Sequence, residues 1–260
     1  MKIDRDILRQ IANIVAILAA FGTNVAANIK PINGLNIGEI SNTLFKDVLI
    51  TPANYAFAIW GVIYLGLFSF AIYQVLPSQR ENSNLHKMGY LLVASSVAQI
   101  VWVFCFLSRS FLLSLLAMLA ILLPLILIYL RLEIGKKRMS RQDKWFVQIP
   151  ITIYLAWISV ATITNVAIAL YDLGWNGWGI SPQIWSAIAL LLAGAVGATI
   201  SLVRVDIAFV SVFVWALVAI ALRHLDKPII STTAGLLAIV LPLLLVLSLL
   251  RRRKLNLKSP

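Results

Sequence analysis

Eight long apolar segments follow one another along this chain of 260 residues, and they constrain its fold more than any other feature. The hydrocarbon core of a bilayer is about 30 Å thick, so a helix needs about 20 apolar residues to cross it. A helix satisfies its own backbone hydrogen bonds, which lipid cannot do. We therefore predict an all-α polytopic membrane protein with about eight transmembrane helices. The expected helices cover residues 7–27, 53–76, 88–107, 111–130, 145–171, 184–203, 207–222 and 229–250.

The composition excludes most soluble classes of protein. Hydrophobic residues make up 61% of the chain and charged residues 12%, with a mean hydropathy of +0.92. Soluble domains average about 45–50% apolar and about 25% charged residues. The net charge of +12 does not indicate a nucleic-acid partner, because the basic residues lie at the ends of apolar segments. The expected partner is the lipid bilayer.

The basic residues are distributed unevenly between the two sides of the predicted bundle. With eight spans, the N-terminus, every second loop and the C-terminus share one side, which carries 17 of the 22 lysines and arginines. Positive charge accumulates on the cytoplasmic side of membrane proteins. We therefore expect a multi-pass protein of a bacterial-type plasma (inner) membrane, with both termini cytoplasmic and residues 28–52 outside.

Residues that carry catalysis are scarce. His86 and His224 lie at helix ends or in loops, where we expect solvated side chains rather than ligands. The single cysteine, Cys105, cannot build a thiolate cluster, and neither paired carboxylates nor a glycine-rich phosphate loop occurs. We expect no catalytic residues, no metal site and no enzymatic activity.

Aromatic residues, with two amides, gather on single faces of three predicted helices, because a helix turns by about 100° per residue. Two interpretations stay open. The rings either pack helices together and anchor them at the membrane interface, or form flat walls around a planar apolar ligand. The residues are Phe57, Trp60, Tyr64 and Phe68 in segment 53–76, Gln99 and Trp102 in segment 88–107, and Tyr154, Trp157 and Asn165 in segment 145–171.

Two further features predict contacts between helices. An amide such as that of Asn165 requires a hydrogen-bond partner inside an apolar helix bundle, and Gln99 is the candidate. The run of small residues at 193–198 predicts close packing of the sixth helix against a neighbour.

The outer loop and the second helix resemble the tryptophan-rich sensory protein family, which includes bacterial TspO and the mitochondrial translocator protein. That family shows L-x-K-P-x4-P-P before its second helix and then F-x3-W-x2-L-Y. The matching positions here are Leu44, Lys46, Pro52, Trp60 and Tyr64.

The third and fifth helices continue the resemblance. Gln99, Trp102 and Phe106 follow the family's N-x2-W-x3-F-F pattern, with Gln in place of Asn. Trp157 and Asn165 keep the eight-residue spacing of the family's fifth helix. The outer loop departs from the pattern, because the family's loop tryptophans and one of its paired prolines are replaced here. The replacing residues are Leu49, Ile50, Thr51 and Asn54.

The resemblance implies a site for porphyrins, sterols or similar aromatic molecules among the first five helices. The two family tryptophans that contact tetrapyrroles match Trp60 and Trp157. The implied ligand-binding residues are Phe57, Trp60, Tyr64, Gln99, Trp102, Tyr154, Trp157 and Asn165, with Lys46 and Pro52 in the loop over the pocket.

The resemblance also implies a division of the chain and a function. Residues 1–171 are expected to form a TspO-like five-helix bundle, and residues 172–260 three additional helices with a basic tail. The implied function is a binding or sensory protein for a planar apolar ligand, acting in stress signalling or regulated transport. No cofactor is required, and a tetrapyrrole enters as a ligand. A small-molecule transporter and a light-dependent porphyrin-degrading protein are the alternatives, and a homodimer is left open.

Overall fold

The computed structural model describes residues 5–256, whereas residues 1–4 and 257–260, with Lys2 and Lys258 of the charge count, lie outside the described residues. The described chain contains helices and turns and no strand. Its long helices are α1 (Arg5–Ile29), α3 (Ile59–Gln74), α5 (Leu91–Leu107), α6 (Phe111–Arg131), α8 (Ile149–Asp172), α9 (Pro182–Thr199), α10 (Ile207–Arg223) and α11 (Pro228–Asn256).

These long helices confirm the predicted all-α polytopic membrane class. Six helical segments of the described chain are long and apolar enough to cross a membrane. The other two, Leu91–Leu107 and Ile207–Arg223, are shorter apolar helices of 17 residues, at the lower limit for a span. Each of the eight expected segments therefore corresponds to an observed helix, displaced by a few residues at its ends.

Shorter elements connect the long helices. They are α2 (Ile37–Thr43), α4 (Ser83–Met88), α7 (Arg141–Asp143), the 3-10 turns η1 (Asn54–Ala58), η2 (Pro77–Gln79) and η4 (Gly177–Gly179), and the π-helical turns η3 (Lys144–Gln148) and η5 (Ile200–Arg204). Residues 37–58, which comprise α2, the turn after it and η1, are called the lid below. The lid begins with a capping box, in which the Asn36 side chain accepts from Glu39 N and Glu39 Oε2 accepts from Asn36 N.

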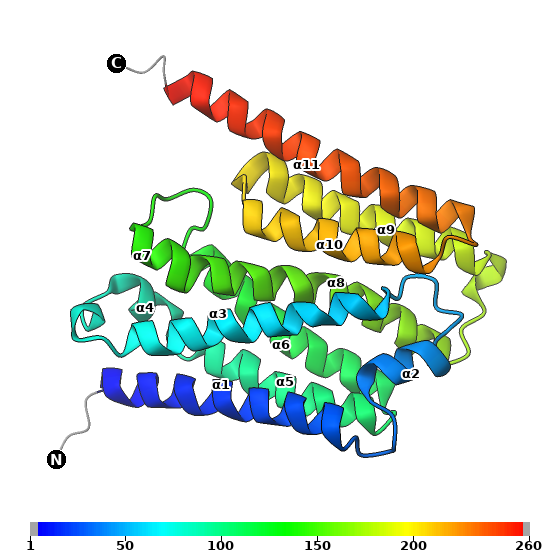
Figure 1. Ribbon diagram of the computed structural model, residues 1–260, viewed down its shortest axis with the longest axis horizontal. Coiled ribbons are helices and arrows are strands. Elements are labelled where there is room, and N and C mark those ends of the chain that lie inside the picture. Colours follow the sequence, from blue (N-terminus) through cyan, green and yellow to red (C-terminus); the bar gives the residue numbers. More distant parts are fainter. Residues whose placement is uncertain (1–4, 257–260) are drawn as a thin grey trace.

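The helices run up and down, so that the described chain starts and ends at the same end of the molecule (Figure 1). The lid lies at the opposite end. Helices α9, α10 and α11 lie together along one side of the bundle formed by α1, α3, α5, α6 and α8 (Figure 1). Helix α8 joins the two groups, because it contacts α3 and α6 on one side and α10 on the other.

The run of small residues in α9 is a packing surface, as predicted. A Cβ at Gly194 would lie 2.5 Å from Leu237 Cδ2, and a Cβ at Gly197 would lie 2.7 Å from Leu241 Cδ1. Both leucines belong to α11. The missing side chains let α9 and α11 approach closely, which is how helices associate where no water drives them together.

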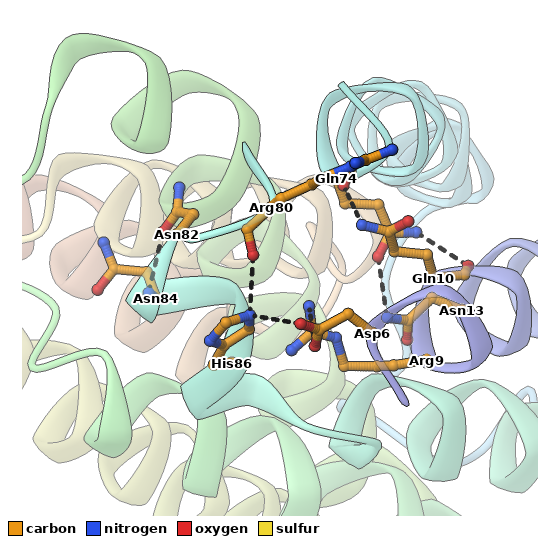
Figure 2. Close-up of polar contacts among 9 residues, drawn as sticks. All are labelled: Asp6, Arg9, Gln10, Asn13, Gln74, Arg80, Asn82, Asn84 and His86. Atoms are coloured by element: carbon orange, nitrogen blue, oxygen red, sulfur yellow. Dashed lines mark hydrogen bonds and ion pairs between the residues drawn. The ribbon is translucent and has the colours of Figure 1, made fainter. Parts of the chain in front are cut away.

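Amide side chains join the first half of α1 to the end of α3 (Figure 2). Gln10 Nε2 donates to Gln74 O at 2.8 Å, and Gln74 Nε2 donates to Gln10 O at 3.3 Å. Asn13 Nδ2 donates to Gln74 Oε1 at 3.1 Å. These interhelical bonds fix the relative position of α1 and α3 along their axes.

A small cluster of charged and polar side chains lies at the start of α1 (Figure 2). The Asp6 carboxylate lies 3.4 Å from the guanidinium of Arg9 and 3.2 Å from His86 Nε2. His86 Nε2 also lies 3.1 Å from Arg80 O. His86 is exposed, as expected from the sequence, and it ties α4 to the start of α1.

The close contact of α9 with α11 leads to a stability prediction. Replacing Gly197 by leucine should lower the free energy of unfolding by about 1–3 kcal/mol, because the new side chain overlaps Leu241 and Phe213. Gly235→Leu is the matched control, since nothing lies within 4 Å of a Cβ at Gly235. Thermal unfolding of both variants in one detergent measures the difference, and equal midpoints would contradict the prediction.

Candidate functional site

An apolar cavity of about 60 Å³ lies where the lid meets α3, α5, α6 and α8. Six of the ten residues expected from the sequence line it, namely Pro52, Phe57, Trp60, Trp102, Trp157 and Asn165. The remaining lining residues are Ile37, Ser41, Phe106, Met118, Val160, Ala161, Thr164 and Ile168. The aromatic faces predicted for three separate helices therefore converge on one space.

Aromatic rings pack edge to face and in stacks around this cavity. Phe57 meets Trp157 edge-on, with 6.2 Å between the ring centroids. Trp60 stacks on Tyr64 at 5.9 Å and meets Tyr154 edge-on at 6.1 Å. Such pairs hold the indoles at fixed angles. The cavity is therefore bounded by rigid, flat and apolar walls.

Tyr64, Gln99 and Tyr154 do not line the cavity but form a hydrogen-bonded chain behind Trp60. Tyr64 donates to Ala20 O at 3.1 Å and accepts from Gln99 Nε2 at 2.6 Å. Tyr154 donates to Gln99 Oε1. Each of these three side chains is buried. One amide thus satisfies two tyrosine hydroxyls and joins α3, α5 and α8 to α1.

Asn165 has partners other than the one expected from the sequence. Its Oδ1 accepts from Trp102 Nε1 at 2.8 Å, and its Nδ2 donates to Ser114 Oγ at 3.0 Å. Gln99 is occupied by the two tyrosines, so the predicted Gln99–Asn165 pair is wrong. The bond to Asn165 fixes the N–H edge of the Trp102 indole, and Trp102 lines the cavity.

A second, more polar space adjoins the cavity. This vestibule of about 320 Å³ shares Ile37, Phe57 and Trp60 with the cavity. Its other lining residues are Asn24, Asn28, Asn36, Gly38, Glu39, Asn42 and Asn54. The three shared side chains therefore separate an apolar inner chamber from an outer chamber rich in amides.

The lid is seated on the bundle by apolar contacts. Phe45 is buried and meets Phe111 and Tyr171 edge-on, at centroid distances of 4.6 and 5.8 Å. Pro52 lines the cavity as expected for a residue over the pocket. Lys46 is exposed and lines a separate outer depression instead.

Helix α10 is bonded to the lid backbone through residues that the sequence reasoning did not single out for the site. Arg223 donates to Asn42 Oδ1 (2.8 Å), Pro52 O (3.0 Å) and Ser41 O (3.0 Å). The other bonds run from Ala53 N to Ala219 O, from Trp215 Nε1 to Ala56 O and from His224 Nε2 to Thr51 O, each at 3.1 Å.

The position of His224 corrects an expectation. The sequence predicted a solvated loop residue, but His224 is only 4% exposed. Burial lowers the pKa of His224 below its ordinary value, so the ring is neutral at neutral pH and donates from Nε2. One sequence signal pointed here: Arg223 is among the few cations on the side that positive charge avoids.

Comparison with known proteins gives one match. The model of the family described as TSPO-like protein matches residues 10–247. This match runs through the long helices from α1 to α11 and is not confined to the first five. No curated protein and no solved structure matches the chain.

The chain of bonds through Gln99 can be tested by substitution. Gln99→Leu leaves the fully buried Tyr154 hydroxyl without its partner, which should lower the free energy of unfolding by about 1–3 kcal/mol. Adding Tyr154→Phe removes the stranded hydroxyl and should restore part of the loss. Ser69→Ala is the control, because Ser69 bonds only within its own helix. A double variant no more stable than Gln99→Leu in thermal unfolding would contradict this reading.

Proposed function

Because the chain belongs to the TSPO-like protein family, we propose that it is a membrane sensor that binds a planar apolar small molecule in the aromatic cavity. Membership of the family supports a membrane binding or sensory protein in general terms. The ligand class, a tetrapyrrole- or sterol-like molecule, is the part that the site itself supports. The observation on which this proposal depends is that Trp60, Trp102 and Trp157 come from three helices and line one space.

The lining chemistry favours a flat, apolar ring system inside the cavity over a charged group. Apart from Ser41, Thr164 and Asn165, every residue around the cavity is apolar, and no charged residue of the described chain lines it. Asn165 and Trp102 already satisfy one another. Flat rings with few free polar groups bind extended apolar surfaces by shape and dispersion.

The small volume of the cavity supports a proposal that this is the closed form of the site. Ligand pockets usually hold about 300–1,000 Å³, far more than the 60 Å³ found here. Together with the adjoining vestibule the space reaches the lower end of that range. A ligand of the proposed size therefore has to displace Phe57 or Trp60, or move the lid.

We propose binding without chemical turnover, and signalling or regulated transport as the consequence of binding. No step in this proposal requires a cofactor. Four of the first five long helices, α3, α5, α6 and α8, supply the walls of the cavity, together with the lid. There are two alternatives. Transport through the bundle predicts a flux of the ligand across the membrane, and light-dependent breakdown of a porphyrin predicts a degradation product.

Binding can be measured by tryptophan emission. Protoporphyrin IX added in the dark should quench the purified protein, and the Trp60→Ala, Trp157→Ala double variant should bind about tenfold more weakly or worse. Trp178→Ala is the control, because Trp178 is 76% exposed and is not one of the residues that line the cavity. Equal affinities of the wild type and the double variant would place the site elsewhere. Illumination should leave the absorption spectrum of the bound porphyrin unchanged.

Orientation in the membrane is a separate prediction. From the charge distribution we expect both termini in the cytoplasm and the lid outside. A reporter fused after Lys258 should therefore give a cytoplasmic signal, and one inserted within residues 35–45 an external signal. An external signal from the C-terminal fusion would contradict the eight-span arrangement.

A further inference from the structure

We propose that helix α10 completes the ligand site by fastening the lid, and that Arg223 is the residue that positions the lid over the cavity. The inference rests on the proposed function in that the lid is taken to cover a ligand. It assigns the C-terminal helices a part in binding, because α10 belongs to them.

The first argument is which groups Arg223 binds. Its guanidinium bridges two parts of the lid that are separated in sequence, the last turn of α2 at Ser41 and Asn42 and the extended stretch at Pro52. The final carbonyls of a short helix have no partner within that helix. Arg223 donates a hydrogen bond to the Ser41 carbonyl, and a planar guanidinium group can donate to several acceptors at once.

The second argument is that the lid has two kinds of attachment. Phe45 is held by apolar contacts with Phe111 and Tyr171, which belong to α6 and α8. The polar bonds from the lid run to α10 and its C-cap residue, through Arg223, His224, Trp215 and Ala219. Loss of the polar bonds therefore leaves the lid held by apolar contacts, those of Phe45 and that of Tyr55 with Trp215.

The third argument is that α10 is itself held in place at its far end. The Asp206 carboxylate accepts from Tyr129 of α6 and from Thr152 of α8, each at 3.1 Å. Asp206 also accepts from Phe209 N and so caps α10. The lid is thus fastened to an element that is fixed to the cavity walls, which a flexible loop would not provide.

The kinetics of ligand exchange distinguish a residue that holds the lid closed from a residue that only stabilises the fold. Arg223→Gln should raise both the association and the dissociation rate constants of protoporphyrin IX about tenfold, because opening no longer breaks charged hydrogen bonds. Arg223→Lys keeps the charge but not the planar set of donors, so its rate constants should lie between those of the wild type and those of Arg223→Gln. Lys227→Gln is the control, because it removes a nearby positive charge whose ion pair is with the adjacent Asp226.

A second measurement needs no ligand. In a Cys105→Ser background, a cysteine placed at Ile50, which is 2% exposed and belongs to the lid, reports opening through its rate of maleimide labelling. Labelling should be faster in Arg223→Gln than in the parent protein or in Lys227→Gln. Faster labelling without any porphyrin binding would support the fastening and overturn the proposed ligand.

Unchanged labelling and unchanged exchange rates in Arg223→Gln would overturn the proposal. If that variant fails to fold, Trp215→Phe serves instead. It removes the N–H that donates to Ala56 O, and it keeps an aromatic ring, although a smaller one, against Tyr55, whose centroid lies 5.0 Å from that of Trp215. Trp215→Phe should accelerate labelling and exchange to a smaller extent, and no acceleration would likewise contradict the proposal.

Discussion

Polar side chains inside an apolar bundle must find partners on neighbouring helices, and the site depends on how two amides meet this requirement. Gln99 of α5 bonds to Tyr64 of α3 and to Tyr154 of α8, which joins the three helices. Asn165 joins Trp102 and Ser114 and brings α6 into the same group. The aromatic walls follow from these bonds, because Trp60 rests on the two tyrosines and Trp102 is held by its N–H.

The sequence predicted the helices and the residues that face inward, for physical reasons that apply to any bilayer. A span must be apolar over about 20 residues, so each transmembrane segment could be recognised from its apolar sequence. The turn of 100° per residue placed Trp60, Tyr64 and Phe68 on one face, and in the structure these three rings form a continuous stack. The contact of Gly194 and Gly197 with α11 was likewise visible as a run of small residues.

The sequence did not predict which residues on other helices these side chains would contact. Periodicity tells which way a side chain points from its helix but not which helix it meets or at what height, so Asn165 was paired with the wrong amide. The bonds from α10 to the lid join positions more than 150 residues apart. A single sequence contains no signal for such register. His224 was misjudged for this reason, since burial at a helix end depends on what folds over it.

The attachment of α10 at both ends limits how the lid can open. Helix α10 has 17 residues and is about 25 Å long, with Asp206 bonded to α6 and α8 at one end and Arg223 bonded to the lid at the other. An opening that breaks the bonds of Arg223 is confined to the lid and leaves the helices in place. An opening that keeps those bonds must tilt α10, and α10 packs against α11. Because α9 and α11 are in close contact at Gly194 and Gly197, such a tilt would move the three C-terminal helices together. If a ligand enters as proposed, the strength of the bonds at Arg223 decides whether the opening stays local or is transmitted along α10 to the end at which the described chain starts and finishes.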